Sequence, residues 1–158
     1  MPALKWGGVI LLLLCGLALS AALCAFERAR LEQARGFHTL CSEIRRQIAC
    51  FSHPVSRILG SIEEDVLAKC RIHTRSEKLS VLLAHTSFYL PEEARERLLT
   101  FAASLGSEYR EEQLRSCEAC IAYLQALCER LEGEAAHRVQ LARLLPLSLT
   151  GALALMLI

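Results

Sequence analysis

The chain has 158 residues, 53% of them hydrophobic and 22% charged, and its formal net charge at pH 7 is +1. Of its 18 basic side chains, 17 lie in the middle of the chain together with all 17 acidic ones. They alternate there without forming a basic block, which argues against nucleic acid as a partner. The sequence also has no phosphate-binding glycine loop, no HExxH zinc motif and no nucleophile elbow. We therefore expect no enzymatic activity, no catalytic residues and no cofactor.

Both ends of the chain are apolar. Trp6 to Phe26 contains no charged residue, and Leu144 to Ile158 is a second uncharged run. A helix needs about 20 apolar residues to cross a hydrocarbon core of roughly 30 Å, so the first run is long enough to span a bilayer and the second is marginal. The pattern predicts an N-terminal transmembrane helix at residues 6–26 and a short C-terminal membrane segment at residues 144–158.

The charges beside the two apolar runs indicate which side of the membrane the middle of the chain occupies. Arg28 and Arg30 follow the first run, and Arg138 and Arg143 precede the last one. Cytoplasmic flanks of membrane helices carry an excess of Lys and Arg. Residues 27–143 should therefore form a cytoplasmic domain, which is long enough to have a core of its own.

A cleaved signal peptide is the alternative interpretation of the N-terminus. Lys5 precedes an apolar stretch that includes small residues such as Ser20 and Ala21, an arrangement also found in secretory signals. The protein would then be an exported, membrane-anchored helical binding module, and its cysteines would form disulfides in an oxidising compartment. The anchor is favoured because the run is longer than a usual signal core of about 7 to 15 residues and a basic flank follows it.

The first helix should continue beyond the apolar run. Apolar residues recur mostly at spacings of three and four from Leu31 to Phe51, and Pro54 is expected to break the helix. Ser61 followed by Glu64 fits a capping box, which predicts a helix that begins at Ser61 and ends near Arg71.

Two more helices are expected in the middle of the chain. Thr74 with Glu77 fits a second capping box, which predicts a helix over residues 75–89. Pro91 then stands at a favoured first helical position, and two acids follow it in the first turn, where the helix dipole favours negative charge. This helix should run to Leu105.

A glycine and a serine separate that helix from the last one. Gly106 should occupy a left-handed position at the helix end, and Ser107 can cap the next helix, which is the longest of the domain. One face of this helix carries the apolar residues Leu114, Cys117, Ile121, Leu124, Cys128, Leu131, Ala135 and Val139. No segment alternates with period two, so the sequence predicts an all-α fold: a helical bundle between a transmembrane helix and a short C-terminal membrane segment.

Six of the eight cysteines lie among helix-forming residues of the middle domain. In a cytoplasmic domain they are interpreted as buried free thiols that pack like small hydrophobic side chains. Cys117 and Cys120 form a CxxC, but a zinc site needs about four ligands and this motif supplies two. A redox CxxC normally opens a helix after a strand, and no strand is predicted here. We therefore expect no metal site, and a thiol or metal protein built on this pair is the second alternative.

Two motif segments carry a resemblance to a known family. Gln47 to Val55 resembles the "EI.YG.TPL" segment of the stage III sporulation protein AB family, and Phe101 to Gly106 with Gln113 matches that family's "F...LG......Q" in register. Cys50-Phe51 stands in place of Tyr-Gly, and Tyr109 stands where an acid is common. The residues that carry the match are Pro54, Leu105, Gly106, Gln113 and, in the terminal apolar segment, Gly151.

The resemblance implies a role in endospore formation. The protein would be a non-enzymatic membrane component of the channel complex between mother cell and forespore, lying in the mother-cell membrane that faces the forespore. The family's helical domain is similar to the cytoplasmic domains of the type II secretion platform protein. The implied partners are other stage III sporulation membrane proteins and a secretion-type ATPase, and a homo-oligomer is compatible with this role.

Overall fold

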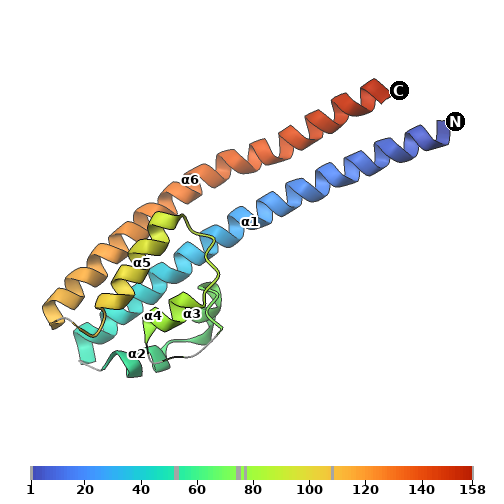
Figure 1. The fold of residues 1–158 in the computed structure, drawn as a ribbon. Helices are drawn as coiled ribbons and strands as arrows, with labels where there is room; N and C mark the ends of the chain where they lie inside the picture. The colour runs from blue at the N-terminus through green and yellow to red at the C-terminus, as the bar shows by residue number, and fades with distance from the viewer. Residues whose placement is uncertain (1, 52–53, 74–75, 77, 108, 158) are drawn as a thin grey trace. The chain divides into compact units, whose positions relative to one another are not determined.

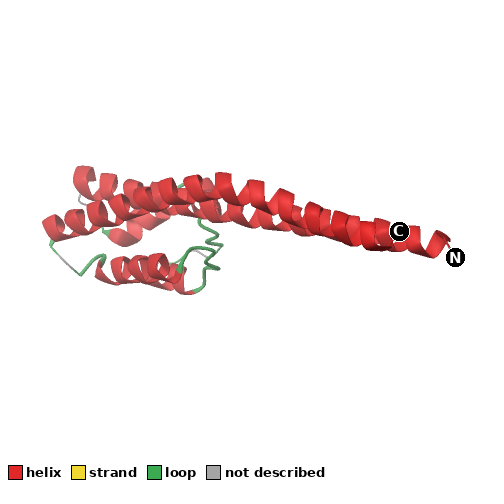
Figure 2. Cartoon of the chain, turned by 90° about the horizontal axis from the view of Figure 1, so that it is seen from above, coloured by secondary structure: helices red, strands yellow, loops and turns green. Residues whose placement is uncertain are grey.

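In the computed structural model, every regular element of the described residues is a helix (Figures 1 and 2). The structure describes the backbone of residues 2–51, 54–73, 76, 78–107 and 109–157, and it describes their side chains except at residues 2–7, 9, 12–13, 136–147 and 149–157. The predicted all-α class is confirmed. In chain order the helices are α1 (Pro2–Phe51), α2 (Val55–Ser61), α3 (Glu64–Lys69), α4 (Leu79–Ala84), α5 (Glu92–Ser104) and α6 (Arg110–Leu157).

The chain divides into two compact units. The terminal unit contains Met1–Ala29 and Leu131–Ile158, and the central unit is Arg30–Arg130. Helices α1 and α6 contribute to both units, whereas α2 to α5 belong to the central unit alone.

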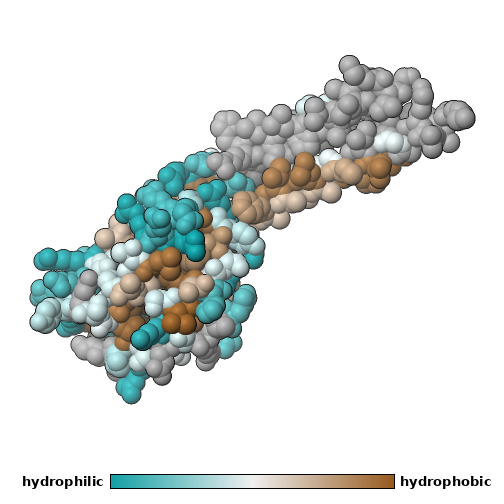
Figure 3. All heavy atoms as spheres, viewed as in Figure 1, coloured by the Kyte–Doolittle hydropathy of each residue, from teal (hydrophilic) through white to brown (hydrophobic). Residues whose placement is uncertain are grey.

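Within the terminal unit, Figure 1 shows the two helical segments running in opposite directions, with both chain ends at the same end of the unit. The described side chains of α1 here form a largely hydrophobic surface (Figure 3). Its large exposed apolar residues are Ile10, Leu11, Leu14, Leu17, Leu19, Leu23 and Phe26.

The two predicted membrane segments lie partly outside the residues whose side chains the structure describes. Among the residues whose side chains are described, no helix is both long enough and apolar enough to cross a membrane. Residues 6, 7, 9, 12 and 13 of the predicted transmembrane helix lie outside that set, as does every residue of the 144–158 segment except Ser148.

The core of the central unit takes buried residues from all six helices, including one face of α1 and one face of α6. Along α1 the buried residues recur every three or four positions, as the sequence predicts, because 3.6 residues per turn places them on one face. The α6 face is shifted: Cys120 and Leu127 are buried, whereas Ile121 and Cys128 of the predicted stripe are only half-buried. Val139 lies outside the described side chains. The buried hydrophobic residues of α1 in the central unit are Ala34, Phe37, Leu40, Cys41, Ile44 and Ile48.

A buried glutamine connects α1 to two loops of the central unit. Gln33 is fully buried, and its Nε2 donates to the carbonyl oxygens of Cys70 at 3.3 Å and Ser87 at 2.8 Å. Its Oε1 accepts a hydrogen bond from the backbone N–H of Tyr89 at 2.8 Å. A buried amide without partners would cost free energy, so this arrangement holds both loops against α1.

Helices α1 and α3 approach closely at Gly36. A Cβ at this position would lie 2.9 Å from Cβ of Lys69, 3.0 Å from its carbonyl carbon and 3.1 Å from the backbone nitrogen of Cys70. Two of these three atoms belong to the backbone, which cannot rotate away as the end of a flexible side chain does. Gly36 is therefore required by the packing of α3 against α1.

The predicted helix from Ser61 to Arg71 is wrong at its start. Ser61 is the last residue of α2, and α3 begins three residues later at Glu64. The Ser61 hydroxyl donates to the carbonyl oxygen of Ile58, so it does not cap α3. The predicted end is nearly correct, because α3 ends at Lys69.

A Schellman motif terminates α3. Arg71 has a φ of +60°, its N–H donates to the carbonyl of Ala68, and the N–H of Ile72 donates to the carbonyl of Leu67. The Arg71 guanidinium lies 4.2 Å from the ring centroid of Tyr89 and donates a 2.7 Å hydrogen bond to its hydroxyl. These contacts hold a non-glycine residue in a position that glycine usually fills.

The predicted helix over residues 75–89 is shorter in the structure. Thr74 and Glu77, which form the predicted capping box, lie outside the described residues. Helix α4 covers only Leu79–Ala84, and Tyr89 is not helical. The backbone around Tyr89 is instead bonded to Gln33, a long-range contact that replaces the local helix bonds.

The last two helices begin later than expected. Helix α5 begins one residue after Pro91, and α6 begins three residues after the expected cap, Ser107. Pro91 is the N-cap of α5, with φ −56° and ψ 150°, and two acids occupy the first turn as predicted. Helix α5 ends at Ser104, one residue before the predicted end. The Ser107 hydroxyl donates to the carbonyl of Ser104, so it does not cap α6, which begins at Arg110.

Candidate functional site

The two sequence-motif segments lie against each other at one end of the central unit. Arg110 donates from Nε to the carbonyl oxygen of Ile48 at 3.2 Å and from Nη2 to that of Ala49. These carbonyls belong to the last turn of α1, where the helix itself provides no bonding partner. The guanidinium therefore closes the C-terminal end of α1. We refer to residues 47–55 together with 101–113 as the motif junction.

Gly106 turns the chain between α5 and α6. Its φ is +91°, Leu105 before it has φ −66° and ψ 119°, and the N–H of Ser107 donates to the carbonyl of Ser104 at 3.2 Å. These values fit a type II turn, which requires a positive φ at its third position. A Cβ added at Gly106 would lie 3.5 Å from Cγ2 of Val55, which places the turn against the start of α2. The positive φ agrees with the sequence prediction.

Three of the remaining motif residues also lie at the junction. Pro54 is exposed and is the N-cap of α2, with φ −62° and ψ 144°. Leu105 and Gln113 are half-buried, and the Gln113 N–H donates to the carbonyl of Tyr109 in the first turn of α6. Gly151 lies in α6 within the terminal unit, where its surroundings are outside the described side chains. Four of the five predicted residues thus belong to the two segments, which meet through Gly106 against Val55 and through Arg110 at the end of α1.

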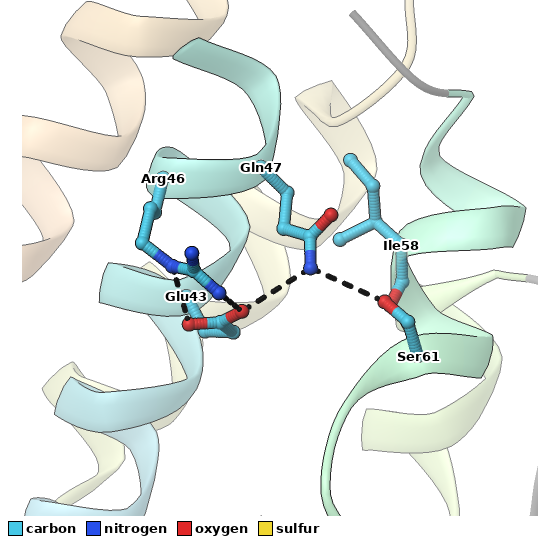
Figure 4. Close-up of polar contacts among 5 residues, drawn as sticks. All are labelled: Glu43, Arg46, Gln47, Ile58 and Ser61. Atoms are coloured by element: carbon cyan, nitrogen blue, oxygen red, sulfur yellow. Dashed lines mark hydrogen bonds and ion pairs between the residues drawn. The ribbon is translucent and has the colours of Figure 1, made fainter. Parts of the chain in front are cut away.

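A polar network connects α1 to α2 beside the junction (Figure 4). Gln47 donates from Nε2 to Oε1 of Glu43 at 3.2 Å and to the hydroxyl of Ser61 at 3.3 Å. Arg46 pairs with the same Glu43 carboxylate, and this hydrogen bond holds the pKa of Glu43 below its usual value. The Ser61 hydroxyl in turn donates a hydrogen bond to the carbonyl oxygen of Ile58. The network explains why Ser61 belongs to α2 and is not available as a cap for α3.

Two aromatic side chains are exposed at the junction. Phe51 is 57% exposed and Tyr109 is 86% exposed. Both are positions at which the sequence differs from the motifs of the family that it resembles, the stage III sporulation protein AB family. Large aromatic residues are enriched in protein interfaces, because they bury a large area with little loss of conformational freedom. Phe51 and Tyr109 are therefore exposed side chains of a type that protein interfaces often bury.

A second cluster of interest consists of cysteine thiols in the core of the central unit. All eight cysteines are free. Of the six that the sequence interpretation expects to be buried, Cys41, Cys70, Cys117 and Cys120 are buried, whereas Cys50 is exposed and Cys128 is half-buried. The Sγ atoms of Cys41 and Cys120 lie 3.7 Å apart and share a hydrogen bond in which either can donate. The sequence pattern pairs Cys120 with Cys117 in a CxxC, but the sulfur of Cys120 lies against that of Cys41 on α1.

The four buried thiols differ in acidity. Burial raises the pKa of Cys70 to about 12 and that of Cys117 to about 11. The hydrogen bond with Cys120, together with burial, raises the pKa of Cys41 well above its usual value. The same hydrogen bond lowers the pKa of Cys120, and the positive charge of Arg97 lowers it further. Cys120 is the thiol that is most readily ionised among these four.

An open groove lies between α5 and α6 in the central unit, with a volume of about 600 Å³. The Arg97 guanidinium lies 4.5 Å from the ring centroid of Tyr123, and the buried Tyr123 hydroxyl has no hydrogen-bond partner. Burial raises the pKa of Tyr123. The groove is lined by both acids and hydroxyl groups: Glu93, Glu96, Arg97, Thr100, Phe101, Ser104, Ser116, Ala119, Cys120 and Tyr123.

The described residues contain no group of three or more His, Cys, Asp or Glu side chains placed to hold a metal ion. His73 and His85 are exposed and His38 is half-buried. His53 and His137, the other two histidines, lie outside the described side chains.

Sequence reasoning missed four residues that organise the central unit. Gln33 and Arg110 bond to backbone groups far away in the chain, Gly36 permits a close helix contact, and Cys41 meets Cys120 across two helices. A polar residue within the apolar face of α1 was the one available signal, since Gln33 occupies such a position. The other three depend on long-range contacts that leave no local pattern.

No family model, no curated protein and no solved structure matches the chain.

Proposed function

We propose that the chain is a non-enzymatic membrane component of a sporulation channel, similar to a secretion platform, that docks a cytoplasmic ATPase. It would lie in the mother-cell membrane facing the forespore, with its central unit in the cytoplasm and other stage III sporulation membrane proteins as neighbours. The observation that supports this best is the meeting of the two family-like segments: Arg110 of the second bonds the main chain of the first, and Gly106 lies against Val55.

The exposed apolar surface of the terminal unit supports the membrane part of the proposal. Leu11, Leu14 and Leu17 recur every three positions along α1 and are all exposed. Exposure of so many large apolar side chains to water is unfavourable. Lipid around α1 would remove this cost. Together with an uncharged run of membrane-spanning length, this favours a transmembrane helix at residues 6–26 and a membrane segment at residues 144–158.

Vesicle flotation tests the anchor. Leu14→Arg combined with Leu17→Arg should move the full chain from the membrane fraction to the soluble or aggregated fraction, because a charged side chain in the bilayer core costs roughly 2.5 to 3.5 kcal/mol. Val81→Arg is the matched control, since Val81 is an exposed apolar residue of the central unit. Flotation of the double variant equal to wild type would contradict the anchor. A mature N-terminus beginning near Ala22 would instead favour the exported binding module.

The exposed aromatic residues at the motif junction support the docking part. The full chain, purified from sporulating cells in mild detergent, should retain a secretion-type ATPase. Phe51→Ala with Tyr109→Ala should reduce the retained ATPase at least tenfold, because exposed aromatic residues often dominate interface energies. Val81→Ala is the control for loss of exposed apolar area elsewhere. Equal retention by all three proteins would contradict docking at the junction.

The cellular role has its own test. Deletion of the gene should reduce heat-resistant spores by several orders of magnitude without slowing vegetative growth. A normal spore yield from the deletion strain would contradict the sporulation role and leave the membrane anchor unaffected.

A further inference from the structure

The pair formed by Cys41 and Cys120 is placed for chemistry that the proposed function does not use. The two sulfurs are 3.7 Å apart, and they come from α1 and α6, the two longest helices. A disulfide needs a sulfur separation of about 2.05 Å, so small side-chain rotations or helix shifts must supply the difference. Cys41 is 1% exposed and Cys120 is 8% exposed.

Access to the pair is one-sided. Cys120 lines the groove between α5 and α6, whereas Cys41 lies in the core next to it. The groove is open to solvent and large enough for small molecules. A small reagent can therefore reach the sulfur of Cys120 before that of Cys41. Cys41 is the neighbouring thiol that can then react with the modified Cys120.

The surroundings make the two thiols unequal. With Cys41 as donor, their hydrogen bond stabilises a thiolate at Cys120, and Arg97 on the groove wall adds a favourable charge. The thiolate is the nucleophilic form of cysteine. Cys117 and Cys70 have raised pKa values and stay protonated at neutral pH. The placement of charge and hydrogen bonds thus distinguishes Cys120 from its neighbours.

We propose that Cys120 is a hydroperoxide-reactive thiol and that Cys41 converts its oxidised form into a disulfide that crosslinks α1 to α6 in the central unit. In the first step the Cys120 thiolate attacks one oxygen of the hydroperoxide. The S–O bond forms, the O–O bond breaks, and the leaving oxygen takes a proton to become an alcohol or water. Cys120 becomes a sulfenic acid, the sulfur losing two electrons to the peroxide.

In the second step the sulfur of Cys41 attacks the sulfur of the Cys120 sulfenic acid. The S–S bond forms, the S–O bond breaks, and the hydroxide leaves as water with the proton of the Cys41 thiol. Two thiols and one hydroperoxide thus give one disulfide, one alcohol and one water. A dithiol reductant reverses the crosslink by thiol–disulfide exchange.

The crosslink would join two helices that otherwise meet through apolar packing, the exposed Arg45–Glu118 ion pair and the hydrogen bonds of Arg110 to the carbonyl oxygens at the end of α1. It would restrict separation of α1 from α6 within the central unit, since a covalent bond replaces a weak sulfur contact. Oxidation would therefore fix the central unit in one arrangement.

Peptide mapping of the oxidised wild-type chain tests the proposal directly. The full chain in detergent micelles is treated with a small excess of hydrogen peroxide, alkylated, and digested with trypsin without reduction. The expected product joins the peptide 36–45, which carries Cys41, to the peptide 116–130, and fragmentation places the bond at Cys120. A bond from Cys120 to Cys117, or Cys120 overoxidised with no crosslink, would overturn the proposal.

Two variants serve as matched controls. Cys117→Ala and Cys128→Ala should give at least 80% of the wild-type crosslink, because neither thiol takes part. Cys41→Ser should abolish the crosslink and raise the sulfenic acid trapped by a dimedone probe at Cys120 at least fivefold. If Cys41→Ser does not fold, the wild-type peptide map alone decides the outcome.

Discussion

The two halves of α1 treat their apolar side chains in opposite ways. Residues 10–26 carry no charge, and their described large apolar side chains are exposed. Residues 34–48 bury their large apolar side chains and present charged residues such as Arg45 and Arg46 to solvent. One continuous helix can therefore contain both a segment that needs a partner and a segment that has one. The helix periodicity determines which residues share a face, and the chain packed around that face determines whether it is covered.

The central unit also satisfies backbone groups with long-range polar contacts, from the buried Gln33 and the exposed Arg110. Gln33 satisfies backbone groups of two loops, and Arg110 satisfies the end of α1. Single substitutions in the core of the central unit should therefore lower its free energy of unfolding. In the N-terminal half of α1, the substitutions with the largest effect should be those that introduce a charged side chain.

Replacement of Gln33 by Leu should have the largest effect on stability. It leaves the backbone groups of Cys70, Ser87 and Tyr89 without partners, and buried unsatisfied groups cost about 1 to 3 kcal/mol each. The free energy of unfolding of the central unit, measured by hydrogen exchange of its core amides, should fall by about 3 kcal/mol. Gln125→Leu is the control, because Gln125 is exposed and bonds only to Glu129. Equal effects of the two variants would contradict the role of Gln33.

Alkaline pH should destabilise the central unit through its buried thiols. The folded pKa of Cys70 is raised by burial to about 12 from 9.0, so the folded state holds its proton more tightly than the unfolded chain. The resulting stability is fully present below pH 9 and is lost as pH rises towards 12. By pH 11 the loss should be about 2 to 3 kcal/mol. Denaturant melts at pH 8 and pH 11 measure it, and Cys70→Ala should show a correspondingly smaller decrease.

Gly36→Ala tests the close contact of α1 with α3. The new Cβ would meet the backbone of Lys69 and Cys70 at 3.0 and 3.1 Å, so the helices must separate at a cost of about 2 kcal/mol. Gly60→Ala is the matched control in the same unit, because nothing lies within 4 Å of its Cβ position. That change should stabilise α2 by up to about 1 kcal/mol. A Gly36→Ala protein as stable as wild type would show that the contact is not tight.

Gly106→Val should have the smallest of these effects. A β-branched residue at a φ of +91° is strained by about 1 to 2 kcal/mol, and Gly106→Ala should cost less. Thermal melts of the three proteins give the comparison. Identical melting temperatures would mean that the turn between α5 and α6 does not constrain the fold.

The parts of the fold that depend on local sequence could be predicted. The buried apolar face of α1 up to Ile48, the end of α1 at Phe51, the acids at the start of α5 and the positive φ of Gly106 all follow from rules that act within a few residues. The failures have the opposite cause. Ser61 and Glu64 have the sequence of a capping box, but Ser61 accepts a hydrogen bond from Gln47 of α1, and tertiary contact overrides the local preference.

The candidate sites show the same division. The motif junction could be predicted as two segments, because each has its own pattern, but their contact through Arg110 could not. The CxxC pattern pairs Cys120 with Cys117. In the structure the sulfur of Cys120 lies against that of Cys41, which is 79 positions away in the sequence and belongs to α1. Spacing along one helix cannot reveal a partner on another.

The topology of the chain tests the central claim most directly, and Cys50 provides the probe because it is exposed in the central unit. Intact cells are treated with a membrane-impermeant maleimide, and the tryptic peptide 47–57, which contains Cys50 as its only cysteine, is quantified. A chain anchored at both ends with a cytoplasmic central unit predicts labelling only after the membrane is permeabilised, with the protein retained in the membrane fraction. Full labelling of Cys50 in intact cells would contradict this topology.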